Sequence, residues 1–303
     1  MSRTVVVTGS SSGFGRKVSE EFARRGERVY ASMRDTEGKN AAAAEALEAL
    51  ALKERVDLRV LELDVTSTSS VASAAAKVLA ESGAPDVIIN NAGQLFVGFT
   101  EAFSAEEFTN QLEVNLVGVH RVIRAFLPAM RTRGCGLIVN ISSIAGRCTL
   151  PFHGVYHASK WALEGYSQSL RTELACSGID LVVVEPGMFA TALFAGSRTP
   201  EDCEDRVSTY PAVARQCFEE TGAKFKALLA DPNAPTDPML VANQIIALAQ
   251  AAPGTRPFRS VVGIDFGVGA LNAATEPYDK ALLESMGLTS FTTIPAQNES
   301  EET

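Results

Sequence analysis

Short apolar runs rich in β-branched residues alternate with longer amphipathic stretches through the first two-thirds of the chain. Several short runs are almost continuously apolar, which is typical of strands buried on both faces of a parallel sheet. The longer stretches are rich in Ala, Leu, Glu, Lys and Arg, which favour helices. The alternation predicts an α/β fold with about seven parallel strands and helices on both faces. Strands are predicted at 4–8, 28–33, 58–63, 87–90, 137–141, 181–185 and 259–264, and helices at 14–25, 39–53, 69–81, 105–132, 155–176, 213–229, 239–251 and 267–287.

The pattern changes after residue 190, where Gly and Pro residues surround a single helical stretch. Because strand and helix signals resume afterwards, this segment is interpreted as an insertion that caps one domain. The prediction is a single domain over 1–303, with a core at 1–190, the insertion at 191–238, the last helices and strand at 239–290, and a frayed tail at 291–303.

The composition is that of a soluble globular protein, with 46% hydrophobic and 21% charged residues among 303. The net charge of −9 argues against a nucleic-acid-binding protein, which is normally basic. No apolar run approaches the roughly 20 residues that a membrane helix needs. No signal peptide is recognisable, and the five cysteines form no C-x-x-C pair, so free thiols and a cytoplasmic location are predicted.

A glycine-rich turn follows the first predicted strand, with Gly9, Gly13 and Gly15 in the spacing G-x-x-x-G-x-G. Glycines permit a tight turn and let a pyrophosphate approach the backbone, while the next helix offers free N–H donors and a positive dipole end. A plain strand-to-helix turn is the alternative interpretation of such a loop.

Tyr156 and Lys160 are separated by one helical turn, so both side chains can face the same cleft. A free phenol has a pKa of about 10, and a nearby ammonium group lowers it. Tyr156 is therefore a candidate general acid for a carbonyl oxygen, or a base in the reverse direction. By itself the pair is also compatible with an ordinary amphipathic surface helix.

The ordered set of motifs resembles the short-chain dehydrogenase/reductase family, in its compact one-domain branch of carbonyl-reductase-like enzymes. The resemblance extends from about 4 to 191 and implies a Rossmann-type doubly wound sheet with a substrate-loop insertion and a C-terminal extension. The matching motifs are the glycine-rich loop, Asn90-Asn91-Ala92-Gly93, Asn115, Ser143 placed thirteen residues before Tyr156, Lys160, and Pro186-Gly187 with Thr191.

The resemblance implies a catalytic set of Asn115, Ser143, Tyr156 and Lys160. Ser143 would bind the substrate oxygen, Tyr156 would transfer the proton, and Lys160 would lower the pKa of Tyr156 and bind the nicotinamide ribose. Asn115 would hold a water that connects Lys160 to solvent. Ser142 is the competing serine, with backbone hydrogen bonding as its alternative role. The expected cofactor-binding residues are Gly9, Ser11, Ser12, Gly13, Phe14, Gly15, Arg34, Asp64, Val65, Asn91, Ala92, Gly93, Tyr156, Lys160, Pro186, Gly187 and Thr191.

The end of the second strand bears on the choice of cofactor. An acid there selects NAD, whereas an arginine accommodates the 2′-phosphate of NADP. Met33 stands in the place of the acid and Arg34 follows it, so NADP(H) is predicted and NAD is less favoured. Asp35 reaches the ribose if the strand ends one residue later, and Ser12 stands where some NADP-using relatives have a second basic residue.

Aromatic and apolar residues in several loops are predicted to form a substrate pocket, with ordinary core packing as the alternative. His153 and His157 lack a third ligand at a recognised spacing, so no metal site is predicted. The expected substrate-binding residues are Phe96, Phe152, His153, Met188, Phe189 and Phe194, with Leu193 in the same segment.

The predicted activity is NADPH-dependent reduction of a ketone to a secondary alcohol, or the reverse oxidation. Substrates of 3-oxoacyl, steroid or retinoid type share this chemistry, and a non-catalytic NADP-sensing protein is the alternative from another class. A small-molecule substrate is expected, with no nucleic-acid or membrane partner. A homodimer or homotetramer is possible, and the basic stretch with Arg121, Arg124, Arg131 and Arg133 suits a subunit contact or a solvated helix face.

Overall fold

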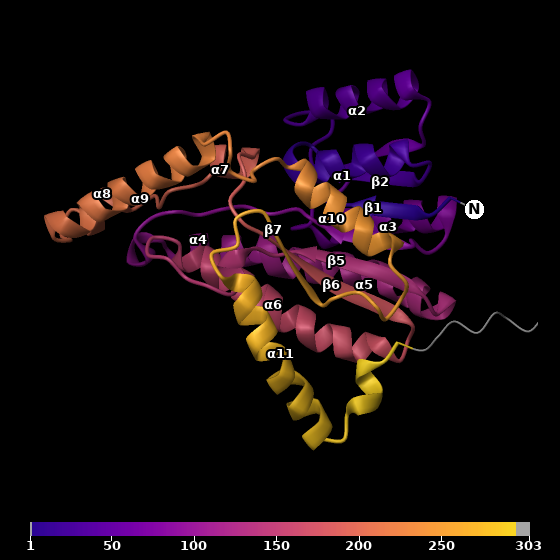
Figure 1. The fold of residues 1–303 in the computed structure, drawn as a ribbon. Coiled ribbons are helices and arrows are strands. Elements are labelled where there is room, and N and C mark those ends of the chain that lie inside the picture. Colours follow the sequence, from indigo (N-terminus) through magenta and orange to yellow (C-terminus); the bar gives the residue numbers. More distant parts are fainter. Residues whose placement is uncertain (1, 295–303) are drawn as a thin grey trace, which may run out of the picture.

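A seven-stranded sheet forms the centre of the computed structural model, which describes residues 2–294 (Figure 1). The strand order is β3-β2-β1-β4-β5-β6-β7, and every pairing is parallel. The order reverses between β1 and β4, which creates the crevice where ligands bind in such sheets. The predicted Rossmann-type α/β fold is thus confirmed. The strands are β1 (Thr4–Val7), β2 (Arg28–Met33), β3 (Leu58–Glu62), β4 (Val87–Asn90), β5 (Gly136–Ile141), β6 (Ile179–Pro186) and β7 (Arg259–Val262).

Helices cover both faces of the sheet, as the continuous apolar strands require. Val5 and Val7 pack with α1, α2 and α10, whereas Val6 between them packs with α3, α5 and α6 on the opposite face. None of the helices within the described residues has the length and hydropathy needed to cross a membrane. The helices are α1 (Gly13–Arg24), α2 (Ala41–Glu54), α3 (Thr68–Ser82), α4 (Ala105–Leu112), α5 (Gly118–Arg133), α6 (Gly154–Ala175), α7 (Ala192–Ala195), α8 (Cys203–Val207), α9 (Ala212–Ala230), α10 (Met239–Gln250) and α11 (Val268–Ser285).

The single helix predicted at 105–132 is divided in the structure. A π-helical segment, η2 (Glu113–Val117), separates α4 from α5. Hydrophobic periodicity does not reveal such a bulge, because a π turn adds one residue without ending the helix. Asn115 lies in this segment with its side chain buried, and its neighbour Val114 lines the cavity described below.

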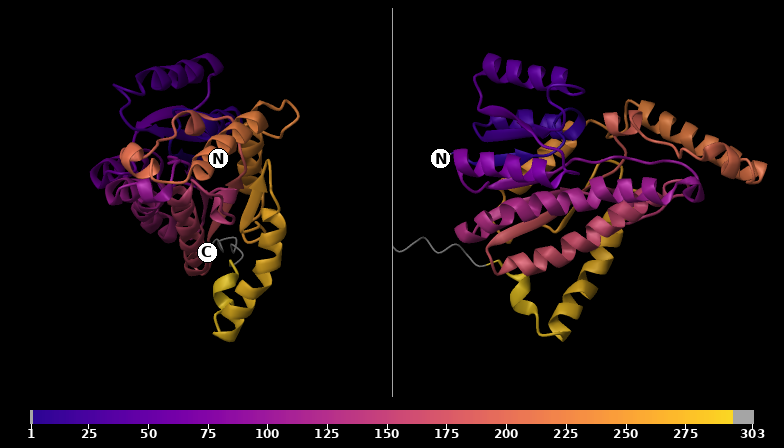
Figure 2. Two further views of the ribbon diagram at one scale, coloured as in Figure 1. Left: turned by 90° about the vertical axis from the view of Figure 1, so that its left-hand side faces the viewer. Right: turned by 180° about the vertical axis from the view of Figure 1, so that it is seen from behind.

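The segment 191–238 leaves the core as an arm made of α7, α8 and α9, whereas the sequence predicted only the last of these helices. Helices of four and five residues are too short to show a periodic pattern. The arm projects beyond the sheet on the side opposite the N-terminus (Figures 1 and 2). After it, α10 and β7 return to the core, whereas α11 begins beside β7 with the buried Val268 and then extends away from the sheet (Figure 1). A short 3₁₀ helix covers Thr289–Thr292, so the tail predicted to be frayed from 291 begins ordered, and its residues 295–303 lie outside the described part.

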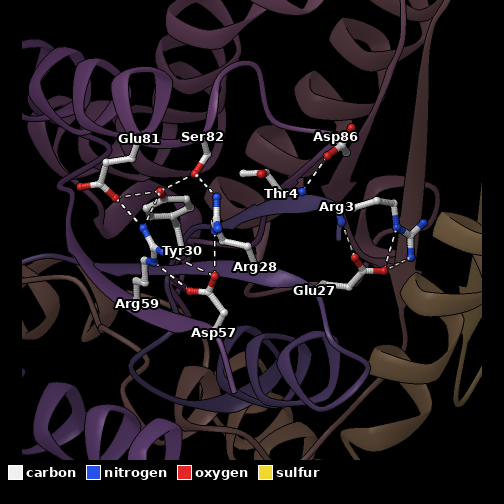
Figure 3. A network of polar contacts seen from close by, with 10 residues as sticks. All are labelled: Arg3, Thr4, Glu27, Arg28, Tyr30, Asp57, Arg59, Glu81, Ser82 and Asp86. Atoms are coloured by element: carbon white, nitrogen blue, oxygen red, sulfur yellow. Dashed lines mark hydrogen bonds and ion pairs between the residues drawn. The ribbon is translucent and has the colours of Figure 1, made fainter. Parts of the chain in front are cut away.

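The amino ends of the first strands are joined by polar contacts (Figure 3). The Arg3 guanidinium pairs with Glu27, and the Thr4 N–H donates to Asp86 at 2.6 Å. The Tyr30 hydroxyl donates to Glu81 at 2.8 Å. The residues at the opposite, carboxyl end of the strands are therefore the ones free to form a binding site.

Candidate active site

One cavity of about 950 Å³ extends along the carboxyl ends of the strands, from the glycine-rich turn to the arm. Sixteen of the seventeen predicted cofactor residues line it, Gly15 being the exception. A Cβ on Gly15 would collide with the Gly9 carbonyl and the Asn91 amide, so this glycine allows the turn to pack rather than facing the cavity.

The glycine-rich turn is fixed in place by hydrogen bonds between Thr8 and Asn91, which directly follow the neighbouring strands β1 and β4. The Asn91 side chain donates to the carbonyls of Thr8 at 2.9 Å and Gly9 at 3.0 Å. In return, the Thr8 hydroxyl accepts the N–H groups of Asn91 and Ala92, each at 3.0 Å. These four bonds fix the β1 and β4 loops against each other at the reversal point of the sheet.

The start of α1 has the form of an anion-binding site. Gly9 and Gly13 adopt positive φ values of +70° and +56°, which glycine tolerates without strain. Ser12 precedes the helix without capping it through its side chain, so the first N–H groups remain available to a ligand. With the dipole end added, this turn suits a pyrophosphate.

The loop after β2 contains Arg34 and Asp35, the two residues that bear on the choice between NADP and NAD, and it places them differently. Arg34 lines the cavity together with Lys39 and Asn40, two residues that the sequence reasoning missed. Asp35 instead has a φ of +52°, and its carboxylate accepts the N–H of Lys39 at 2.8 Å. The Asp35 carboxylate is therefore used within its own loop. The signal for Lys39 was a second cation five positions after Arg34.

Tyr156 and Lys160 lie on the same face of α6 and both line the cavity. The Lys160 ammonium donates to the Ile141 carbonyl at 2.9 Å and lies 5.8 Å from the centre of the Tyr156 ring. Ser143 follows β5; its hydroxyl accepts the Ala145 N–H at 3.1 Å and donates to the Pro186 carbonyl at 3.3 Å. The structure thus brings these three residues together beside the glycine-rich turn.

Burial shifts the pKa values of the two α6 residues in opposite directions. It raises the pKa of Tyr156 to about 12, and the hydrogen bond with Ser143 opposes this shift. Burial also lowers the pKa of Lys160 to about 8, with the Glu164 carboxylate opposing it. Burial is the dominant influence on the phenol. The lowering of the Tyr156 pKa by Lys160 that the resemblance implies therefore stays an expectation.

The Asn115 side chain is committed to contacts within the chain, whereas the Ser142 hydroxyl does not form, within the described residues, the backbone hydrogen bond expected as its alternative role. The Asn115 amide bridges the backbone of Gln94, accepting its N–H at 2.9 Å and donating to its carbonyl at 3.0 Å, and also donates to Ser159 at 3.0 Å. The side chain thus fastens the loop after β4 to α6. The Ser142 hydroxyl is buried and has no partner within the described residues.

Four of the six predicted substrate residues line the cavity and two do not. His153, Met188, Phe189 and Phe194 line the cavity, as does Leu193. Phe96 instead stacks on Phe103 with ring centres 5.7 Å apart, and Phe152 contacts Phe99 at 5.0 Å. Aromatic residues give the same sequence signal in a pocket wall and in a packed cluster, and only the docking of the arm separates them.

The two histidines near Tyr156 have different surroundings. His157 accepts the Leu150 N–H at Nε2, at 2.9 Å, and therefore donates from Nδ1 to the Ala145 carbonyl at 2.8 Å. This ring holds the loop after β5. His153 donates from Nδ1 to the Pro151 carbonyl at 3.0 Å, and burial lowers its pKa. Its Nε2 is consequently left as an acceptor in a residue that lines the cavity.

Comparison with known proteins identifies the class to which this fold and site belong. The family model for short chain dehydrogenase matches residues 3–202. The chain therefore belongs to the short-chain dehydrogenase/reductase family of oxidoreductases, which use nicotinamide cofactors, and the resemblance found in the motifs is confirmed. The open glycine-rich turn and the uncapped start of α1 fit the pyrophosphate of such a cofactor.

Individual relatives cover different parts of the chain. A 3-ketodihydrosphingosine reductase of Bacteroides thetaiotaomicron is 37% identical over 190 residues, covering 62% of this chain and 64% of that protein. An NADPH-dependent pterin aldehyde reductase of Arabidopsis thaliana is 38% identical over 192 residues, covering 63% and 76%. Among solved structures, a short-chain dehydrogenase from Streptomyces avermitilis is 31% identical with a TM-score of 0.74, covering 95% of this chain and 98% of that one.

Proposed function

We propose that this protein reduces a ketone to a secondary alcohol with NADPH, or catalyses the reverse oxidation. The observation that carries the proposal is that Ser143, Tyr156 and Lys160 line the same cavity as the phosphate-binding turn. A phenol, a hydroxyl and an ammonium group around one point can bind a carbonyl oxygen and protonate it. The name of the Bacteroides relative, a keto reductase, supports the same reaction type.

Each residue of this set has a separate task in the proposed mechanism. Ser143 hydrogen-bonds the substrate oxygen and stabilises the charge that develops there. Tyr156 holds its proton at neutral pH, because its pKa is about 12, and delivers it from the phenol oxygen to the substrate oxygen. Lys160 provides positive charge beside the phenol and binds the ribose of the cofactor. The nicotinamide supplies the hydride when it is bound.

Asn115 contributes through position rather than by contact with substrate. Its amide holds the loop after β4 against α6, and its backbone lies in the π-helical segment η2. Backbone groups in a π bulge are offset from the regular helical pattern. We assign this segment the task of holding a water that connects Lys160 to solvent.

The 2′-phosphate of NADPH is assigned to Arg34 and Lys39. Both line the cavity beside Met33, where an NAD-selecting acid would otherwise stand. The Asp35 carboxylate accepts a backbone N–H within its loop and does not line the cavity, which favours Arg34 over it as the residue that meets the ribose. The Arabidopsis relative is named as NADPH-dependent, which is consistent with this choice.

The substrate proposed for this site is largely apolar, since Met188, Leu193 and Phe194 line the cavity near Tyr156. Ketones of 3-oxoacyl, steroid or retinoid type remain candidates with the same chemistry. The cytoplasmic location and a homodimer or homotetramer stay predictions of the sequence.

The Tyr156→Phe variant tests the proton donor. A panel of neutral ketones is assayed by loss of NADPH absorbance, and NADPH binding is measured separately by fluorescence. We expect turnover to fall by a factor of about 100 or more, as for loss of a general acid, while NADPH binding changes little. Turnover that persists unchanged in the variant would remove Tyr156 from the mechanism. A wild-type protein that neither oxidises NADPH with a ketone nor reduces NADP with a secondary alcohol would overturn the proposed function.

A further inference from the structure

The charges along the cavity are distributed very unevenly. Asp64 is the one acid among the described residues that line it, and it lies at the cofactor end. Two basic residues, Arg198 and Lys224, line the other end, where the arm covers the cavity. The whole chain carries a net charge of −9, so a cavity end with cations and no acid does not reflect the average composition. The field inside this part of the cavity favours an anion.

Arg198 is positioned by both its backbone and its side chain. Its N–H donates to the Leu95 carbonyl and its carbonyl accepts the Val97 N–H, each at 2.9 Å, so it forms a bridge between the arm and the core. Its guanidinium lies 5.7 Å from the centre of the Phe96 ring. A cation held over an aromatic face has lost part of its freedom before a ligand arrives, which reduces the entropic cost of binding.

Lys224 reaches the same end of the cavity from α9. Phe225 and Leu228 line the cavity from the same helix, so Lys224 has apolar lining residues beside it. Arg198, Lys224 and Lys226 are all exposed, but Lys226, two positions after Lys224, does not line the cavity.

Acids in the arm and in the core beside it do not neutralise these two cations. Glu101 and Asp202 form ion pairs with Arg206. Among the residues that the structure describes, neither Arg198 nor Lys224 has a carboxylate within ion-pairing distance. Their charges are therefore available to a ligand.

We propose that the substrate is an anionic amphiphile, with its keto or hydroxyl group at Tyr156, its apolar body along α9, and a carboxylate at Arg198 and Lys224. This inference rests on the proposed function, since it extends the same site. It narrows the substrate class from apolar ketones to keto acids or hydroxy acids with a long apolar spacer. Guanidinium binds a carboxylate through paired hydrogen bonds, and the lysine adds a mobile second charge.

Two probes with the same apolar chain, one with a carboxylate and one without, measure the contribution of the carboxylate to binding. Decanoate and decanol are titrated into the full-length protein saturated with NADPH, so that the cations of the cofactor end are engaged, and dissociation constants are measured by calorimetry. We expect decanoate to bind at least about fivefold more tightly than decanol, which corresponds to one partly exposed ion pair. The advantage should shrink as salt is added, because exposed charges are screened.

Substitutions test whether the tighter binding of decanoate depends on Arg198 and Lys224. Arg198→Gln and Lys224→Gln should each reduce the preference for decanoate by half or more, with little change for decanol. Lys226→Gln is the matched control on the same helix and should keep the full preference.

The outcomes distinguish this inference from the function on which it rests. Equal binding of the two probes, or a preference that survives in both Arg198→Gln and Lys224→Gln, would overturn the anionic substrate class. A preference lost equally in Lys226→Gln would show attraction to the general surface and would overturn it too. The proposed function is judged separately, by NADPH-dependent reduction of neutral ketones, which does not need these two residues.

Discussion

The Lys160 ammonium lies 5.8 Å from the centre of the Tyr156 ring and donates its hydrogen bond to the Ile141 carbonyl, at 2.9 Å. Both side chains are almost fully buried. Burial disfavours the charged form of each, so the phenol retains its proton and the amine releases its proton more readily. The pair is arranged for proton donation at neutral pH rather than for a standing phenolate.

The pH dependence of the two reaction directions should follow from this arrangement. Reduction needs the Tyr156 proton and the Lys160 charge, so its rate should fall as pH rises through about 8, where Lys160 loses its proton. Oxidation needs a group that accepts a proton, so its rate should rise over the same range. Initial rates in both directions between pH 6 and about 10 check this. A reduction rate that increases above pH 8 would contradict the assignment.

Arg34→Ala should weaken binding of NADPH by a factor of about 10 or more while changing NADH little, because only NADPH carries the 2′-phosphate. Lys39→Ala should act in the same direction with a smaller effect. Cofactor KM values measured with one ketone provide the comparison. Lys53→Ala, which removes an exposed cation of α2 away from the cavity, is the control. Equal losses for both cofactors in Arg34→Ala would argue against a phosphate contact.

Lys160→Met should abolish turnover and yet stabilise the protein measured without cofactor. The folded state lowers the pKa of Lys160 from 10.5 to about 8, so the unfolded chain binds more protons between these values and the charge costs stability at lower pH. We expect the free energy of unfolding to rise by about 1–3 kcal/mol at pH 7. Denaturant unfolding measures it. A variant less stable than the wild type would show that the Ile141 hydrogen bond outweighs the desolvation cost.

Glu185 should make the protein less stable in alkaline solution. Burial and the neighbouring Glu164 carboxylate raise its pKa from 4.5 to about 8. The folded state binds more protons than the unfolded state between these values, so the free energy of unfolding falls as pH increases across that window.

Glu185→Gln should remove this slope, a change of up to about 1.4 kcal/mol per pH unit, while keeping an oxygen for the Asn272 amide, which donates at 2.5 Å. Denaturant unfolding at several pH values between 5 and 9 checks it. The exposed Glu284→Gln variant should keep the wild-type slope. A slope that persists in Glu185→Gln would assign the effect to another group.

Local patterns predicted the sheet and most of the site because both depend on short stretches of sequence. The glycine-rich turn, the loop after β4 and the Tyr156–Lys160 pair each lie within a few residues of a strand or helix end. Asp35 was undecided because its direction depends on a positive φ that residue type does not reveal. Gly15 packs against the backbone instead of lining the cavity, and a glycine that faces a ligand has the same sequence signal.

The remaining differences between the sequence prediction and the structure depend on contacts between segments that are far apart in the chain. Phe96 and Phe152 were assigned to the pocket, and Lys224 was overlooked, because each depends on where α9 lies relative to the core. The contacts that decide this, such as the Arg198 bridge to Leu95, join segments about a hundred residues apart. The cofactor half of the site could therefore be predicted from local sequence motifs, whereas the substrate half depends on contacts between distant segments.

The arm of α7, α8 and α9 has a consequence for how specificity can change. Residues 192–230 contribute Phe194, Arg198 and Lys224, among others, to the lining of the cavity but no strand to the sheet. Exchanging this segment for that of another family member should transplant a substrate preference, with hydride and proton transfer left to the unaltered body of the enzyme. The substrate preference of this fold can thus change through substitution of a single continuous segment of the sequence.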